Sequence, residues 1–113
     1  PRNMFRGTPL AFATDCLALH EAKLAVGTGA DMAIKPEWRA FVYLPFEHSE
    51  NLTDQTMSVK LFTELGDADY LDYAIRHREV IEQFGRFPHR NAFLARASTE
   101  AELAYLAQPG AGF

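Results

Sequence analysis

Hydrophobic positions recur along this chain with the spacing of helices. In the segment 68–84, the side chains of one face follow one another at intervals of four and three residues. They are Tyr70, Ala74, His77, Ile81 and Phe84. The pattern predicts a helix over about 68–84, with Asp67 as its N-cap and His77 on its inner face. A histidine on such a face is more often a core residue satisfied by a hydrogen bond than a ligand.

Capping and stop residues predict three more helices. A helix over about 16–26 ends at a Gly-Thr-Gly sequence, and a helix over about 51–65 ends at a glycine. Thr99 and Glu102 form a T-x-x-E capping box, which begins a last short helix that runs to about Ala107.

A further helix is expected after Pro36, which suits a first helical position. Apolar residues from Trp38 to Leu44 cover nearly every side of it, so it is predicted to be buried. Pro45 lacks a backbone N–H and biases Leu44 away from helical angles, which predicts a kink or break there. Because no segment shows strand alternation, the fold class is predicted to be all-α, with antiparallel helix pairs joined by short loops.

Composition and charge limit the possible functions. The chain has 113 residues, 48% hydrophobic and 23% charged, which fits one globular domain. Its net charge of -4 argues against broad affinity for nucleic acid or anionic lipid, since such binding needs clustered positive charge. The single cysteine, Cys16, is expected to be a packing residue, and the absence of cysteine pairs predicts a reducing, cytoplasmic setting. No apolar run reaches membrane-spanning length, so no membrane partner is expected.

The sequence FEHSE, residues 46–50, places polar side chains directly after the apolar helix. Glu47 and His48 are candidate catalytic residues, because an imidazole titrates near neutrality and a neighbouring carboxylate tunes it. The alternative is that both simply need hydrogen-bond partners beside a buried segment. Ser49 and Asn51 are interpreted as helix caps.

The sequence FGRFPHRNAF, residues 84–93, combines basic side chains with phenylalanines. Arg86, His89 and Arg90, with Asn91 beside them, predict an anion pocket, since the arginine fork suits carboxylate or phosphate and the apolar neighbours exclude water. The alternative is architectural: the same side chains can bind helix C-termini and hold the loop in place.

The chain also opens with PRNMF, a short echo of PHRNAF at residues 88–93. Arg2 and Asn3 are therefore included among the candidate ligand-binding residues, although an echo this short also arises by chance. The four histidines show no i, i+4 pair and no cysteine partner, so neither a metal nor another cofactor is predicted.

Four sequences, RGTPLAFATD, YLPFEHSENLTDQ, HREVIEQFGRFPHRNAFLARAST and YLAQPGAGF, resemble the bacterial domain of unknown function 924 family over essentially the whole chain. The resemblance implies a tetratricopeptide-like, right-handed helical array, and the family has no established activity. It also implies one shared polar site, because the matching segments contain the polar residues Arg2, Asn3, Glu47, His48, Ser49, Glu50, Gln55, His77, Arg78, Arg86, His89, Arg90 and Asn91.

Family members carry further helices before the position of Pro1, so the chain is interpreted as a single helical domain that forms the C-terminal part of a longer one. Without those helices, Phe5, Phe12 and the small-residue face of Ala18, Ala22 and Ala25 are expected to be uncovered. A homodimer through the N-terminal region is predicted, since twofold dimers are the commonest way to bury such a face.

These observations lead to two functional hypotheses and one architectural alternative. The first is a non-catalytic helical binding module whose polar, locally basic pocket takes a small anionic ligand or the acidic end of a peptide. The second is a hydrolase-type enzyme that uses Glu47 and His48 as its acid-base pair and Arg90 as an anion clamp. In the third interpretation, all these residues are architectural.

Overall fold

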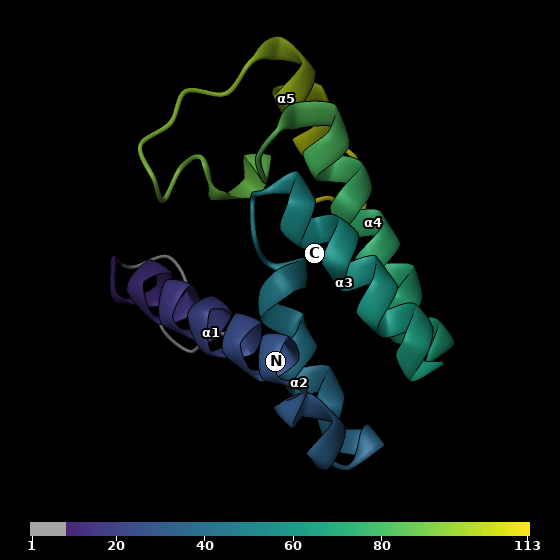
Figure 1. Ribbon diagram of the computed structural model, residues 1–113. Helices are drawn as coiled ribbons and strands as arrows, with labels where there is room; N and C mark the ends of the chain where they lie inside the picture. The colour runs from purple at the N-terminus through teal and green to yellow at the C-terminus, as the bar shows by residue number, and fades with distance from the viewer. Residues whose placement is uncertain (1–8) are drawn as a thin grey trace.

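A computed structural model describes the backbone of residues 9–113 and the side chains of residues 16–113. Its helices, labelled in Figure 1, are α1 (Pro9–Thr28), α2 (Pro36–Glu47), α3 (Leu52–Leu65), α4 (Ala68–Phe84) and α5 (Glu100–Leu106), with short 3₁₀ helices η1 (Ala30–Ala33) and η2 (Pro88–Arg90). Residues 9–113 contain no strand. The predicted all-α fold class is confirmed.

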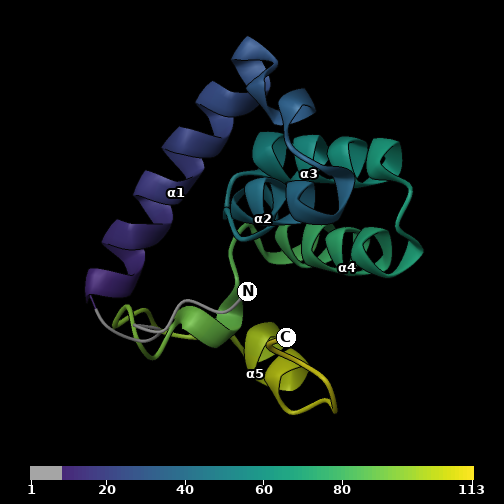
Figure 2. The same cartoon turned by 90° about the horizontal axis from the view of Figure 1, so that it is seen from below.

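Three helices form the centre of the fold. α3 packs against both α2 and α4, and α1 lies beside α2 (Figure 2). Buried apolar side chains from α2, α3 and α4 meet there, among them Tyr43, Phe46, Phe62 and Ala74. The helix α5 lies beyond the end of α4, next to η2, so the loop between η2 and α5 returns the chain to this end of the fold (Figure 2).

The predicted caps set the bounds of the later helices. The side chains of Asn51 and Asp67 each accept two backbone N–H bonds at the starts of α3 and α4. Gly66 ends α3 with φ of 83°, a left-handed conformation that favours glycine. The capping box of Thr99 and Glu102 begins α5, so the sequence located these ends to within about a residue.

Two predicted helix ends are wrong. α1 begins at Pro9 rather than near residue 16, and α2 continues through Pro45 to Glu47. Pro45 lies so near the end of α2 that its missing N–H costs one hydrogen bond, while the turn that follows it buries Phe46 at 3% exposure in the core. Burial of Phe46 therefore outweighs the lost bond.

Two expectations about burial are also wrong. α2 is not buried all round: Trp38 is 58% exposed and Phe41 46%, because the neighbouring helices leave one side of α2 open. Cys16 is exposed on α1 rather than packed. The aromatic run therefore predicts the helix but not which of its sides is covered.

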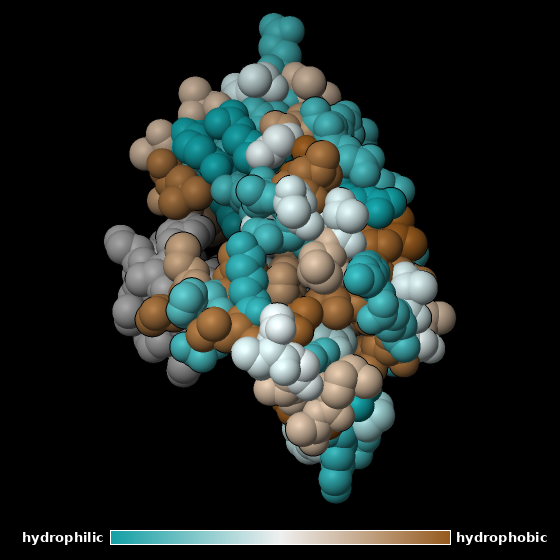
Figure 3. Space-filling view, viewed as in Figure 1, coloured by the Kyte–Doolittle hydropathy of each residue, from teal (hydrophilic) through white to brown (hydrophobic). Residues whose placement is uncertain are grey.

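The chain itself covers part of the face expected to be open. Ala22 is 3% exposed and belongs to the core, while Leu17 and Leu24 on α1 remain exposed. The side chains of Phe5 and Phe12 lie outside the described residues. On the face shown in Figure 3, apolar and polar residues are interspersed. Among the described helices, none is both long and apolar enough to cross a bilayer.

Candidate functional site

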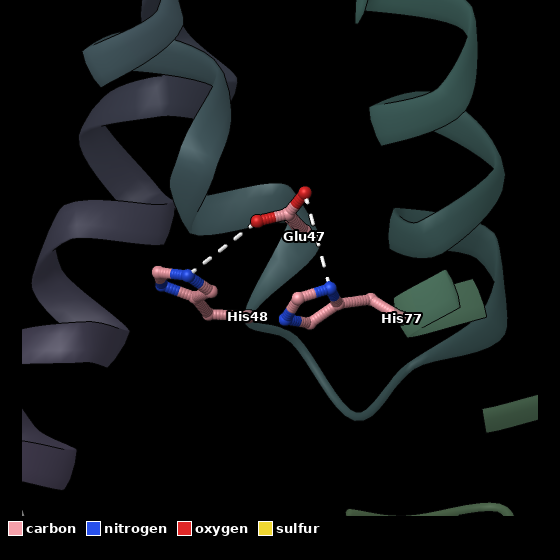
Figure 4. Close-up of side chains that lie close together, drawn as sticks. All are labelled: Glu47, His48 and His77. Carbon is pink, nitrogen blue, oxygen red and sulfur yellow. Dashed lines mark ion pairs between the residues drawn. The ribbon is translucent and has the colours of Figure 1, made fainter. Parts of the chain in front are cut away.

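Three side chains meet where the end of α2 crosses the middle of α4. Glu47 is the last residue of α2, His48 follows it, and His77 comes from the inner face of α4. The Glu47 carboxylate lies between the two imidazoles (Figure 4), with its Oε2 3.7 Å from Nε2 of His48 and its Oε1 3.9 Å from Nδ1 of His77. We call this group the Glu47–His48–His77 cluster.

Gln55 on α3 fixes the backbone beside the cluster. Its side chain is fully buried, and its amide nitrogen donates to the carbonyl of Glu47 at 2.5 Å and to that of Ser49 at 2.7 Å. These carbonyls end α2, where no further helical N–H groups can satisfy them. Gln55 therefore holds Glu47 and His48 in position through their backbone.

The carboxyl group of Glu47 is in an unfavourable environment. Glu47 is 3% exposed, and its Oε1 has no hydrogen-bond partner among the described residues. Burial raises its pKa to about 7, because removing water disfavours the charged form. A buried acceptor without a partner costs about 1–3 kcal/mol, so this oxygen is a place where a ligand has free energy to gain.

His77 is held as a neutral imidazole. Burial and, to a smaller extent, the positive charge of Arg90 lower its pKa to about 4, against the opposing effect of a hydrogen bond to Tyr73. Nδ1 lies 2.7 Å from the carbonyl oxygen of Tyr73. A carbonyl can only accept, so Nδ1 carries the proton and Nε2 carries the lone pair. The predicted core hydrogen bond of His77 is therefore confirmed.

Aromatic rings orient His77 further. Its ring stacks on that of Phe113 at 3.8 Å between centroids, and it meets the ring of Phe87 edge to face at 5.6 Å. Figure 4 shows the second ring nitrogen of His77 turned toward the side on which His48 lies. The lone pair of His77 is thus directed into the cluster.

Arg90 and His89 reach the same region from η2. Nη2 of Arg90 donates to the backbone carbonyl of His48 at 2.7 Å. The guanidinium carbon of Arg90 lies 4.7 Å from the centre of the Phe87 ring. The centre of the His89 ring lies 5.6 Å from the centre of the Phe87 ring. The structure therefore brings Arg90 to the Glu47–His48–His77 cluster, although it lies far away along the chain. His89 reaches the Phe87 ring, which packs against His77.

Arg86 and Asn91 have architectural contacts. Arg86 forms a bidentate pair with Glu102, at 2.7 and 2.8 Å, and also donates to the carbonyl of Ala97. Asn91 is 2% exposed, donates to Ser98, and accepts from Arg96. These bonds hold the loop between η2 and α5. Arg2 and Asn3 lie outside the described residues.

Sequence reasoning included Glu50 in the polar site but missed Arg96, and the pairing of these two residues joins the turn after α2 to this loop. The carboxylate of Glu50 accepts the backbone N–H of Phe87 at 2.6 Å and two bonds from Arg96 at 2.9 and 3.0 Å. Burial opposes ionisation of Glu50, but the bonds from Arg96 and Phe87 lower its pKa. Arg96 lies five residues beyond Asn91, the last of the polar residues predicted in the loop, and no pattern in the sequence pairs it with Glu50.

The fold and the site define an all-α protein with a buried carboxyl between two histidines and an arginine beside them. The chain belongs to the family described as "Bacterial protein of unknown function (DUF924)", whose model matches residues 1–110. The predicted family resemblance is confirmed.

One solved structure carries the same fold: the protein of unknown function ATU0120 from Agrobacterium tumefaciens, at 45% identity and a TM-score of 0.84. The match covers 91% of this chain and 58% of that protein, so the chain spans little more than half the length of its relative. No curated protein matches the sequence.

Proposed function

We propose that the chain is a helical binding module that takes a small anionic ligand, or the acidic end of a peptide, at the Glu47–His48–His77 cluster beside Arg90. The observation that carries the proposal is the buried Oε1 of Glu47, which has no hydrogen-bond partner among the described residues. A buried polar group in this condition marks a place where a further partner is expected.

The chemistry of the cluster narrows the ligand. Oε1 of Glu47 needs a hydrogen-bond donor, whereas the positive charge of Arg90 favours a negative group. An anion that also carries a hydroxyl meets both requirements, as hydrogen phosphate, a phosphate monoester or a hydroxy acid does. His48, whose side chain is 34% exposed, gives such a ligand an approach from solvent.

Inorganic phosphate and sulfate provide a matched pair of probes. Both are tetrahedral anions, but at neutral pH phosphate keeps a hydroxyl that can donate to Glu47 and sulfate does not. In EDTA-treated protein, a phosphate at a hundredfold over its dissociation constant is expected to stabilise the fold by about 2.7 kcal/mol, measured by thermal unfolding. Stabilisation by sulfate to the same extent would contradict the requirement for a donor.

Substitution of Arg90 tests the anionic part of the proposal. Arg90→Ala is expected to weaken phosphate binding by about 1.5–3 kcal/mol, the usual contribution of a charge-assisted hydrogen bond. Arg76→Ala is the control, because Arg76 is an exposed arginine of α4 paired with Asp72. Equal losses in both variants would indicate a general effect of charge and would contradict a site at Arg90.

A second candidate function is hydrolysis with Glu47 and His48 as the acid-base pair and Arg90 as the anion clamp. The contact between the Glu47 carboxyl and the His48 imidazole favours it. Turnover of a phosphate ester or carboxylic ester that binds the wild-type chain is the measurement. Activity that disappears in His48→Ala, with the unfolding transition unchanged, would favour the enzyme, and binding without turnover would favour the module.

A further inference from the structure

We infer that the Glu47–His48–His77 cluster is a binding site for a divalent transition-metal ion of the zinc class. The inference goes beyond the proposed function, because it assigns the site a cation in addition to an anion. The expectation that the chain binds no metal rested on the lack of a histidine pair at i, i+4 and of a cysteine partner. These three side chains come from two separate elements, so no spacing along the sequence could indicate them.

The donor set is the first argument. One carboxylate and two imidazoles are the ligands of many catalytic zinc sites and of non-haem iron sites, in which three protein ligands leave a position open. One ligand atom from each of the three side chains lies within 4.8 Å of the others. In a tetrahedral site with bonds of about 2.1 Å, ligand atoms are about 3.4 Å apart, so the separations between ligand atoms must shorten by up to about 1.4 Å.

The state of each ligand is the second argument. A metal needs a lone pair on the imidazole, and the hydrogen bond from Nδ1 of His77 to Tyr73 leaves that lone pair on Nε2. Metal-binding histidines usually donate their other ring nitrogen to a carbonyl or carboxylate in this way, which fixes the ring and its tautomer. Phe113 and Phe87 hold the same ring on its other sides.

The carboxyl of Glu47 is the third and independent argument. It is at least nine-tenths buried, and its Oε1 lacks a hydrogen-bond partner in the described part of the chain. A cation bound between the carboxylate and the imidazoles would satisfy it. The ligand atoms can approach one another by a movement of the His48 side chain, because this side chain is partly exposed and His48 follows the end of α2.

Three protein ligands would leave one coordination position open, and Arg90 is close to the cluster, because it donates to the backbone carbonyl of His48. An anion can occupy that position on the metal and interact with Arg90 at the same time. The phosphate proposal concerns the metal-free chain, in which Oε1 of Glu47 accepts from the ligand, whereas in the metal-bound chain the cation takes that place. Neither proposal requires the other, and each is measured without the second ligand.

Titration of the EDTA-treated chain with zinc chloride in a phosphate-free buffer is the first test. Isothermal calorimetry is expected to give one zinc ion per chain. Glu47→Gln, which keeps the shape of the side chain, and His48→Ala, at a partly exposed position, are each expected to weaken binding at least about tenfold, the lower limit seen even for outer-shell partners of metals. His20→Ala is the matched control, because it removes an exposed histidine of α1 and should leave the affinity unchanged.

Cobalt(II) provides a second measurement on the unaltered chain, so the result does not depend on the folding of a variant. Visible absorption bands of low-coordinate cobalt are expected to appear on addition of one equivalent and to disappear when zinc is added. Absence of saturable zinc binding, an affinity unchanged in Glu47→Gln and His48→Ala, or its loss in His20→Ala would each overturn the inference. Because the phosphate experiments use metal-free, EDTA-treated protein, their failure and the failure of zinc binding are distinguishable.

Discussion

Among the described residues, Oε1 of the buried Glu47 carboxyl lacks the hydrogen bond that a purely structural role would require. Neighbouring polar groups of the same turn are satisfied: the carbonyl of Glu47 accepts from Gln55, and the carboxylate of Glu50 accepts from Phe87 and Arg96. The carboxyl of Glu47 has two imidazoles at 3.7 and 3.9 Å, longer than hydrogen bonds. An architectural role would be better served by an apolar side chain of similar size.

Replacement of Glu47 by leucine tests this view. Glu47→Leu is expected to raise the free energy of unfolding of the metal-free, ligand-free chain by about 1–3 kcal/mol, because it removes an unsatisfied buried acceptor. Glu50→Leu is the matched control and is expected to lower it, since Glu50 accepts three hydrogen bonds. Urea unfolding followed by circular dichroism measures both, and destabilisation by Glu47→Leu comparable with that of Glu50→Leu would favour an architectural role.

At the scale of the elements, the sequence predicted what local chemistry decides. The caps at Asn51, Asp67 and Thr99 were identified because each side chain bonds to N–H groups two or three residues away. The continuation of α2 through Pro45 was not predicted from the sequence. Burial of Phe46 by the packed helices outweighs the preference of proline to end a helix. Local signals therefore gave the helices, and tertiary packing corrected their ends.

For the candidate site too, the sequence predicted individual residues but not how they are arranged in space. Glu47 and His48 were identified from their position after an apolar helix, and the inner face of α4 correctly gave the burial of His77. The contact of Glu47 and His48 with His77 could not be predicted from the sequence, because it depends on where α2 crosses α4. Arg86 was expected either to bind a ligand or to hold the loop in place. Its bidentate pair with Glu102 on α5 holds the loop in place.

Because Arg86 and Glu102 attach α5 to the rest of the fold, we expect the stability of the fold to depend on pH. The hydrogen bonds from Arg86 and from the Thr99 backbone lower the pKa of Glu102 from 4.5 to about 2. A carboxyl with a lower pKa in the folded state stabilises the fold when ionised, so this stability is complete above about pH 4.5 and is lost as the pH falls toward 2. Acid should therefore release α5.

Glu102→Gln isolates the charge, since glutamine at this position still completes a capping box. The variant is expected to be less stable at pH 7 and to lose less stability between pH 4.5 and 2 than the wild-type chain, as measured by thermal unfolding. Glu100→Gln is the control on the same turn of α5 and should keep the wild-type profile. An unaltered acid dependence in Glu102→Gln would mean that other carboxyl groups dominate.

For the whole molecule, the homodimer remains a prediction. Ala22 is covered within the chain, but Leu17 and Leu24, two turns apart on α1, are 66% and 50% exposed. Burial of apolar surface is worth about 25 cal/mol per Å², and a twofold dimer is the commonest way to obtain it. Sedimentation velocity at micromolar concentration is expected to show a dimer that Leu17→Glu weakens, and a monomer at all concentrations would contradict the prediction.

The most direct test of the ligand site observes the histidine side chains themselves. Long-range ¹H–¹⁵N NMR resolves each imidazole, and a titration of the EDTA-treated chain with inorganic phosphate at constant pH and ionic strength separates binding from screening. We expect the ring resonances of His48 and His77 to move in a saturable way with phosphate, to move less with sulfate, and to leave His20 on α1 unchanged. Resonances of His48 and His77 that stay in place, or that move no more than that of His20, would contradict a ligand site at this cluster.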